Sequence, residues 1–253
     1  MVKEMEKMLA KNVISIIEEF APPHLAIEGD NIGLQVGRDL EKPIEKIGVA
    51  LDPSLQVIKR AWKEGVDFLF THHPLLKDGI KTFDSVIYEK LKILISRDII
   101  LYSAHTNLDI CEGGLNDSLA KLYNLKDTKY LYENGLGRVG IYEGSLEEIL
   151  DITERYICKN PTVINSKVVE DRDTLRVAVL SGYGLSQKNI EYVSKIAEVY
   201  ISGDLTHHSK ILAEDLNLCI IDGGHYGTEV YGLRYFSKYL KEILEVKIVT
   251  LDF

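Results

Sequence analysis

The sequence predicts an α/β protein made of two linked α/β lobes with mostly parallel sheets. Short apolar runs of strand length alternate with amphipathic stretches of helical periodicity over residues 46–253. The same alternation occurs on both sides of a polar stretch at residues 125–136. We therefore expect an N-terminal lobe over residues 1–126 and a C-terminal lobe over residues 127–253. The chain is long enough for each lobe to have a core of its own.

The first lobe is expected to begin with a helix and a loop before the alternation starts. Apolar residues recur at helical spacing over residues 2–20, and Pro22 and Pro23 end this helix. A polar loop rich in glycine follows at residues 28–37. Strands are then predicted at residues 47–51, 66–71 and 99–103, and helices at residues 53–63, 85–95 and 115–123.

The second lobe repeats this pattern with a capped helix near its start. Ser145 and Glu148 have the spacing of a capping box for a helix over residues 146–158. Further helices are predicted at residues 187–197, 208–215 and 228–244. Strands are predicted at residues 138–142, 175–180, 198–202, 218–222 and 246–251.

Composition limits the kinds of partner and compartment. The formal net charge of −9 and the sequence pI near 5.3 provide no basic field for non-specific nucleic-acid binding. The first residues are charged, and no apolar run approaches the roughly 18 residues that span a bilayer. We therefore expect a cytoplasmic protein that binds no membrane.

The cysteines do not point to a disulfide framework or to a thiolate zinc site. Cys111, Cys158 and Cys219 are odd in number and lack CxxC spacing. Cys158 and Cys219 lie in apolar stretches and are expected in the core. Cys111 follows Asp109 by two residues, so a role near a functional site stays open.

The histidines gather behind the predicted strands. Six of the seven follow a strand closely, namely His72, His73, His105, His207, His208 and His225. Strand ends are where open α/β sheets carry their chemistry, so this placement favours a metal centre over packing. Asp109 follows the strand of His105. A lone His-His pair has modest specificity, because one ring can bond inward while the other is solvated, and Asp109 alone could be an N-cap.

His225 and Glu229 form the second notable group. They stand four residues apart at the start of a predicted helix, so both side chains project from one face. The simpler interpretation is that Glu229 complements the helix dipole and His225 caps the turn. Taken together, imidazoles and carboxylates without thiolates suit Zn²⁺, Mn²⁺, Fe²⁺, Co²⁺ or Ni²⁺. Three histidines and two carboxylates are too many for one catalytic metal but suit two, bridged by a carboxylate such as Glu229.

A glycine-rich segment at residues 181–184 is a weaker signal. Ser181-Gly182-Tyr183-Gly184 follows a strand and could cradle a phosphate. It lacks the spacing of the known phosphate-binding loops, so a strand-to-helix turn is favoured.

These motifs resemble the Nif-three-like family, whose dinuclear-metal members carry the name GTP cyclohydrolase 1 type 2 homolog. The segments that carry the resemblance occur in the family's order and span almost the whole chain. They are residues 30–37, Thr71-His72-His73-Pro74-Leu75, Leu108-Asp109, Thr206-His207-His208 and residues 224–229.

The resemblance implies two divalent metal ions per subunit in a crevice between the lobes. His73 and Asp109 would hold one ion, His72 and His225 the other, and Glu229 would bridge them. His105 and His208 would line the crevice as catalytic or ligand-orienting residues, and His207 would lie at its rim. The family also implies a homohexamer.

Two functions from different classes follow. The first is a metal-dependent hydrolase acting on a nucleotide or phosphorylated small molecule, with GTP as the substrate that the resemblance implies. The second is a non-catalytic metal-bound adaptor that binds a regulatory protein or nucleic acid.

Overall fold

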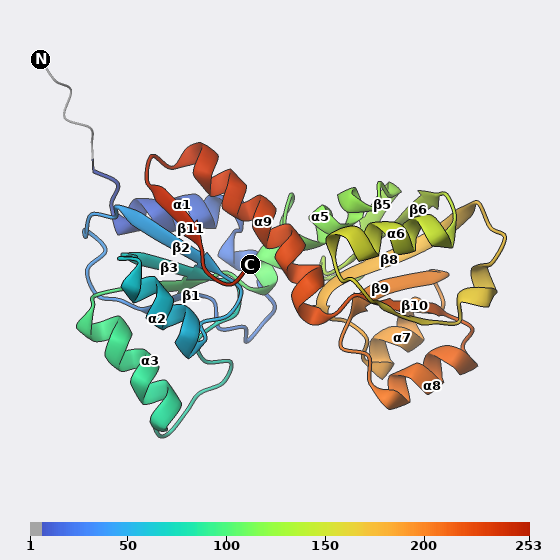
Figure 1. The fold of residues 1–253 in the computed structure, drawn as a ribbon, viewed down its shortest axis with the longest axis horizontal. Helices are drawn as coiled ribbons and strands as arrows, with labels where there is room; N and C mark the ends of the chain where they lie inside the picture. Colours follow the sequence, from blue (N-terminus) through green and yellow to red (C-terminus); the bar gives the residue numbers. More distant parts are fainter. Residues whose placement is uncertain (1–6) are drawn as a thin grey trace, which may run out of the picture. The chain divides into compact units, whose positions relative to one another are not determined.

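The computed structural model describes residues 7–253, which form two compact units, each with its own sheet (Figure 1). Unit 1 comprises the described residues up to Leu108 together with Arg234–Phe253, and unit 2 comprises Asp109–Leu233. The predicted α/β class with two sheets is confirmed.

The units differ from the predicted lobes at both ends of unit 2. Asp109 and the helix after it fall in unit 2, and the last twenty residues return to unit 1. The return has a physical cause, because the C-terminal strand pairs in parallel with the first strand of the alternating region, Val249 opposite Gly48. The division predicted at residue 126 therefore differs from the observed one.

The sheet of unit 1 has the strand order β1-β4-β3-β2-β11. Four strands run parallel, as predicted, and β1 pairs antiparallel with β4 at one edge. The strands are β1 (Gly33–Val36), β2 (Lys46–Ala50), β3 (Phe68–Thr71), β4 (Ile100–Ser103) and β11 (Lys247–Thr250). Because β3 and β4 are neighbours with Thr71 opposite Ser103, the residues that follow them leave the sheet side by side.

Helices cover both faces of this sheet (Figure 1). One face packs against α2 (Leu55–Lys63) and α3 (Ser85–Ser96), where the buried core includes Ile58, Leu69 and Leu94. The other packs against α1 (Ala10–Phe20) and the end of α9 (His225–Ile243), where the rings of Phe70 and Phe236 lie 4.8 Å apart. A short 3₁₀ helix, η1 (Pro23–Leu25), follows α1.

The sheet of unit 2 is mixed, with the strand order β5-β6-β8-β9-β10-β7. Only β8, β9 and β10 run parallel, whereas the pairs β5–β6, β6–β8 and β10–β7 are antiparallel. The prediction of mostly parallel pairing therefore holds for the sheet of unit 1, whereas the sheet of unit 2 combines parallel and antiparallel pairs. The strands are β5 (Lys126–Tyr130), β6 (Arg138–Glu143), β7 (Thr162–Ile164), β8 (Thr174–Tyr183), β9 (Val199–Gly203) and β10 (Cys219–Asp222).

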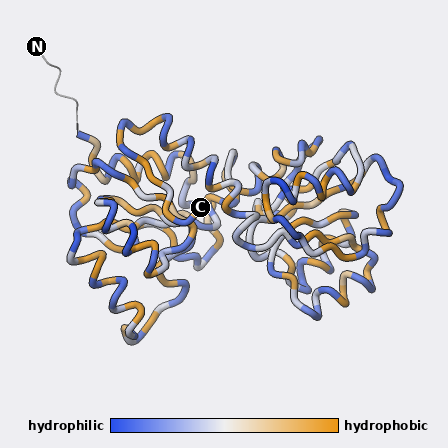
Figure 2. The backbone as a smooth tube through the Cα atoms, in the orientation of Figure 1, coloured by the Kyte–Doolittle hydropathy of each residue, from blue (hydrophilic) through white to orange (hydrophobic). Residues whose placement is uncertain are grey.

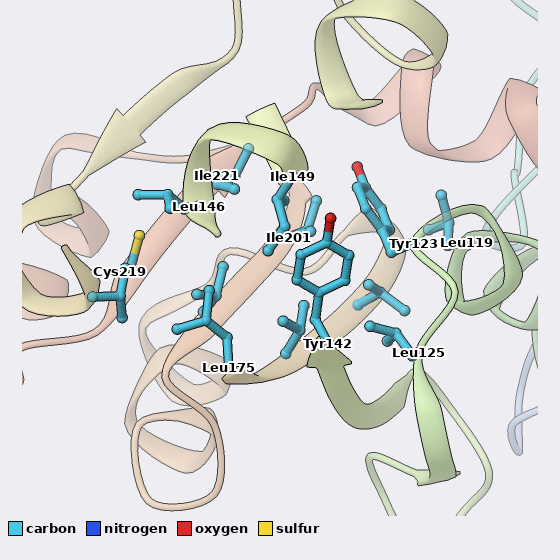
Figure 3. Close-up of a cluster of buried hydrophobic side chains, with 14 of the residues drawn as sticks. Leu119, Tyr123, Leu125, Tyr142, Leu146, Ile149, Leu175, Ile201, Cys219 and Ile221 are labelled. Carbon is cyan, nitrogen blue, oxygen red and sulfur yellow. The ribbon is translucent and has the colours of Figure 1, made fainter. Parts of the chain in front are cut away.

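Two helix pairs sandwich this sheet. On one face lie α5 (Leu115–Leu122) and α6 (Leu146–Tyr156), over the cluster drawn in Figure 3, which includes Tyr123, Ile149 and Ile201. The other face is covered by α7 (Gln187–Val193) and α8 (His207–Asp215). The hydrophobic backbone positions concentrate along the strands of both units, whereas hydrophilic positions dominate the outer helices and loops (Figure 2). The elements α4 (Thr106–Ile110) and η2 (Ser166–Val169) complete the chain.

Three predicted segments differ from the structure. The first helix begins at Ala10, so residues 7–9 of the predicted helix are not helical and residues 1–6 lie outside the described part. The expected glycine-rich loop contains β1, and the expected polar boundary contains β5, whose residues are all exposed. Both are edge strands, which need no apolar run. Within the described residues, no helix combines the length and apolar character needed to cross a bilayer.

Candidate functional site

Unit 1 gathers three imidazoles at the ends of two neighbouring strands. His72 and His73 directly follow β3, and His105 follows β4 after one residue. The ring centroids lie 5.1 Å apart for His72–His73 and for His72–His105, and 5.5 Å apart for His73–His105. One ligand nitrogen from each residue lies within 4.8 Å of the other two. This group can hold a metal ion.

Each of these rings is anchored through Nδ1. The Nδ1 of His72 lies 3.0 Å from the carbonyl oxygen of Ala104, which can only accept, so this nitrogen carries the proton. The Nδ1 of His73 lies 2.8 Å from Oδ1 of Asp52, and that of His105 lies 2.8 Å from Oδ1 of Asp30. In the neutral form of each ring, Nε2 is then the nitrogen that can bind a metal ion. This is the usual arrangement of neutral histidine ligands, so the residues fit a divalent metal ion.

Asp30 is held as a carboxylate from both sides. Its Oδ2 accepts from the backbone N–H of Thr106 at 3.1 Å and from the Thr106 hydroxyl at 2.5 Å. Burial raises the pKa of Asp30, but the hydrogen bonds from His105 and Thr106 outweigh burial and lower the pKa to about 2. Asp30 is therefore charged at neutral pH.

Unit 2 gathers carboxylates around one imidazole. His225 begins α9, and Glu229, one turn later and only 3% exposed, places Oε2 3.1 Å from Nε2 of His225. The other ring nitrogen, Nδ1, lies 2.7 Å from Oδ2 of Asp204. The hydrogen bond with Glu229 raises the pKa of His225, burial opposes it, and the Glu229 and Asp204 charges bring the pKa to about 9. His225 is therefore protonated on both ring nitrogens at neutral pH, and a metal ion bound at Nε2 would have to displace the Nε2 proton.

Asp109 is fixed against the end of β8. It is 6% exposed, and its Oδ1 accepts from the Ser181 hydroxyl at 2.7 Å. The side chain of Asn116 links the two residues, since its Nδ2 donates to the carbonyl of Asp109 and its Oδ1 accepts from the N–H of Ser181. The N-cap interpretation of Asp109 is not needed, because the residue lies inside α4.

Gly182 leaves the space that the Glu229 carboxylate occupies. Its φ is +69°, and a Cβ there would overlap Glu229 and lie 3.2 Å from Nε2 of His225. The Gly182 N–H donates to the Thr228 hydroxyl at 2.9 Å. The segment at residues 181–184, whose interpretations were a turn or a phosphate cradle, therefore contacts Asp109 and Glu229 at the end of β8.

Two other predicted residues lie in different settings. His208 is exposed on α8, and its ring lies 5.4 Å from that of the equally exposed His207. Cys111 is 2% exposed, and burial, with the charges of Asp109 and Asp117, raises the pKa of its thiol to about 12. Among the described residues, Cys111 does not belong to a group whose ligand atoms lie close enough together to hold a metal ion.

Three aspartates of this arrangement were missed as site residues. Asp52 and Asp204 follow β2 and β9, so the strand-end rule that identified the histidines could have identified them. Asp30 belongs to the segment that carries the family resemblance, but spacing alone gives it no partner. Only the pairing of β1 with β4 brings its segment next to His105.

Comparison with known proteins gives consistent results. The model of the Duf34/NIF3 (NGG1p interacting factor 3) family matches residues 8–253. A Methanocaldococcus jannaschii protein named GTP cyclohydrolase 1 type 2 homolog is 65% identical over 246 residues, covering 97% of this chain and all of the relative. A Clostridium acetobutylicum protein of the same name is 34% identical, covering 92% of this chain and 90% of the relative.

Solved structures agree with these relatives. The structure described as reduced HcgD from Methanocaldococcus jannaschii has a TM-score of 0.95 and 64% identity, with 99% of this chain and 100% of that chain covered. A Bacillus cereus protein related to NIF3 shares the fold, with a TM-score of 0.82 at 23% identity and 97% of each chain covered. Together with the family model, these relatives show that the chain belongs to the DUF34/NIF3 family.

Proposed function

We propose that this chain binds two divalent metal ions through His72, His73, Asp109, His225 and Glu229 and hydrolyses a nucleotide or phosphorylated small molecule. The observation that carries the proposal is the anchoring of Nδ1 in His72, His73 and His225 by oxygen atoms, which makes Nε2 the nitrogen of each ring that would bind a metal ion. At His225 the metal ion would replace the proton that Nε2 shares with Glu229. Buried Asp109 and Glu229 supply the negative charge that a pair of dications requires.

The residues of the chain have distinct tasks in this proposal. Bound divalent ions would supply Lewis acidity and an acidified water for hydrolysis. Glu229 suits the bridging position, because a carboxylate offers two oxygen atoms. His105 is proposed to hold or move a proton at Nε2, and His208, which is exposed on α8, is proposed as a second catalytic or ligand-orienting residue. The relatives' name suggests GTP as the first substrate to test.

The test begins with metal content and then measures turnover. We expect purified wild-type protein to hold about two divalent ions per chain by elemental mass spectrometry. Glu229→Gln should hold one or fewer, because the neutral amide cannot bridge. Glu242→Gln, an exposed ion-pairing residue on the same helix, is the matched control and should retain the wild-type content.

Formate release from GTP decides the hydrolase part of the proposal. We expect the wild type and Glu242→Gln to release formate. Release by Glu229→Gln should be slower by about a hundredfold or more, because the variant would lose an ion that activates the attacking water. Wild-type protein with two ions but no turnover of nucleotides or of phosphorylated small molecules would contradict the hydrolase and favour the metal-bound adaptor. Wild-type protein without bound ions, even after incubation with Zn²⁺, Mn²⁺ or Co²⁺, would contradict the metal centre itself.

A further inference from the structure

We propose that Asp30 is a positioning residue that holds His105 in the tautomer protonated at Nδ1. Residues 30–37, which the proposed function does not use, would thereby turn Nε2 of His105 toward His72 and His73. The proposal rests on the proposed function only in treating that direction as the metal side. The first evidence is the contact itself, 2.8 Å between Oδ1 of Asp30 and Nδ1 of His105.

The second oxygen of Asp30 fixes the carboxylate in place. Oδ2 accepts from the backbone N–H of Thr106, a donor that cannot change its role. The Thr106 hydroxyl accepts from the N–H of Ile27 at 3.0 Å, so its own proton is directed to Oδ2. With Oδ2 committed to two donors, Oδ1 faces His105 as an acceptor, and a carboxylate acceptor requires the Nδ1 proton.

The rest of the segment attaches to the two strand ends that carry the imidazoles. Asn31 donates from Nδ2 to the carbonyl oxygen of Leu76 at 2.7 Å, four residues after His72. Gln35 donates from Nε2 to the carbonyl oxygen of Asn31 at 3.2 Å, a hydrogen bond within the same segment. Gly33, with φ at +90°, then pairs with Ser103 at the end of β4. These contacts hold Asp30 in register with both strand ends.

An asparagine at position 30 distinguishes positioning from mere structural support. Its side chain has one acceptor and one donor, whereas this place requires acceptors on both sides. The amide oxygen satisfies the fixed N–H of Thr106 best, which turns the NH₂ group toward His105. His105 must then accept at Nδ1 and carry its proton on Nε2. We therefore expect Asp30→Asn to invert the tautomer while keeping the shape of the side chain.

The experiment observes the tautomer directly in the full-length, metal-free protein. Two-dimensional ¹H–¹⁵N spectra of histidine-labelled protein, with the His105 signals assigned through His105→Gln, should show an Nδ1–H tautomer in the wild type. In Asp30→Asn they should show Nε2–H. Titration with Co²⁺, followed by its visible spectrum, should give a lower affinity in Asp30→Asn, because the proton on Nε2 of His105 would then face His72 and His73 and oppose a bound cation.

Asp67→Asn is the matched control. Asp67 is also half-buried in unit 1, but its Oδ2 alone accepts from the N–H groups of Glu45 and Lys46, so an amide oxygen can replace it. This variant should keep both the tautomer of His105 and the Co²⁺ affinity. If Asp30→Asn does not fold, Asp30→Ala serves instead and should show a mixture of tautomers.

Two results would overturn the proposal. One is an Nε2–H tautomer of His105 in the wild type, a result that does not depend on the folding of any Asp30 variant. The other is a folded Asp30→Asn protein with the Nδ1–H tautomer and wild-type Co²⁺ affinity. A wild type that takes up no Co²⁺ contradicts the proposed function, whereas the spectra of the metal-free protein still decide the role of Asp30.

Discussion

The two units supply candidate ligands of different kinds and hold them in different ways. In unit 1, His72, His73 and His105 emerge from adjacent parallel strands, and their mutual placement follows from the register of β3 and β4. In unit 2, the start of α9 brings His225 and Glu229 one turn apart, and a glycine on β8 leaves room for the carboxylate.

The two groups of candidate ligands also differ in charge. The unit 1 group consists of imidazoles whose Nδ1 atoms meet oxygen acceptors, so in its neutral form each ring can bind a cation through Nε2. The unit 2 group holds two buried carboxylates and an imidazole with a pKa raised to about 9. The candidate ligands of unit 1 are therefore imidazoles, and unit 2 supplies the carboxylate candidates Asp109 and Glu229.

Gly182→Ala is expected to have the largest effect. It tests whether the position of the Glu229 carboxylate depends on the missing side chain at residue 182. The left-handed φ costs about 1–2 kcal/mol of the free energy of unfolding for alanine. The overlap with Glu229 adds about 1–3 kcal/mol, typical of overpacking. Because the carboxylate must move, Co²⁺ affinity should fall at least tenfold. Chemical denaturation and Co²⁺ titration measure the two effects.

Gly29→Ala separates backbone strain from overlap. Gly29 has φ at +85°, but a Cβ there meets nothing within 4 Å. This variant should lose only the 1–2 kcal/mol of backbone strain and keep the metal affinity. Equal behaviour of the two variants would show that Glu229 does not need the space at Gly182, and the contrast between the units would lose its structural basis.

Asp204→Asn is expected to have a smaller effect, because the amide oxygen can still accept from Nδ1 of His225. The variant removes a charge but not the contact, so we expect about a tenfold loss of Co²⁺ affinity, the lower end for such partners. Asparagine also tolerates the φ of +67° at this position. Asp215→Asn, at an exposed site on α8, is the control. An unchanged affinity in Asp204→Asn would place the needed charge on Asp109 and Glu229 alone.

Much of the fold could be predicted from the sequence, because buried parallel strands read as apolar runs. Strands such as β3 and β4 and helices such as α2 and α6 lie within a few residues of their predicted positions. The polar edge strand β5 could not be predicted in this way, since each of its residues is exposed. The return of β11 to unit 1 was also missed, because pairing with β2 is a long-range choice that local periodicity does not contain.

The candidate site likewise has features that local sequence patterns predict and features that depend on distant residues. Strand-end placement predicted His72, His73 and His105 as candidates, and i,i+4 spacing predicted His225 with Glu229. Their binding of metal ions stays a prediction. The partners of their Nδ1 atoms come from elsewhere in the chain, as with Asp30, 75 residues before His105. Gly182 was noticed only as part of a turn, because its role depends on a side chain of another element.

The smallest effect concerns whether the two units unfold together. Ser145→Ala removes the capping box of α6 in unit 2, and Ser54→Ala removes the N-cap of α2 in unit 1. Each should lower the free energy of unfolding by about 1 kcal/mol and leave the Co²⁺ affinity unchanged.

The chain passes between the units twice, at Leu108–Asp109 and inside the continuous helix α9, so unfolding of one unit disrupts a helix that also belongs to the other. We therefore expect one calorimetric transition that both variants shift downward. Two transitions, with each variant shifting only one, would instead show that the neutral and the charged ligand groups fold independently.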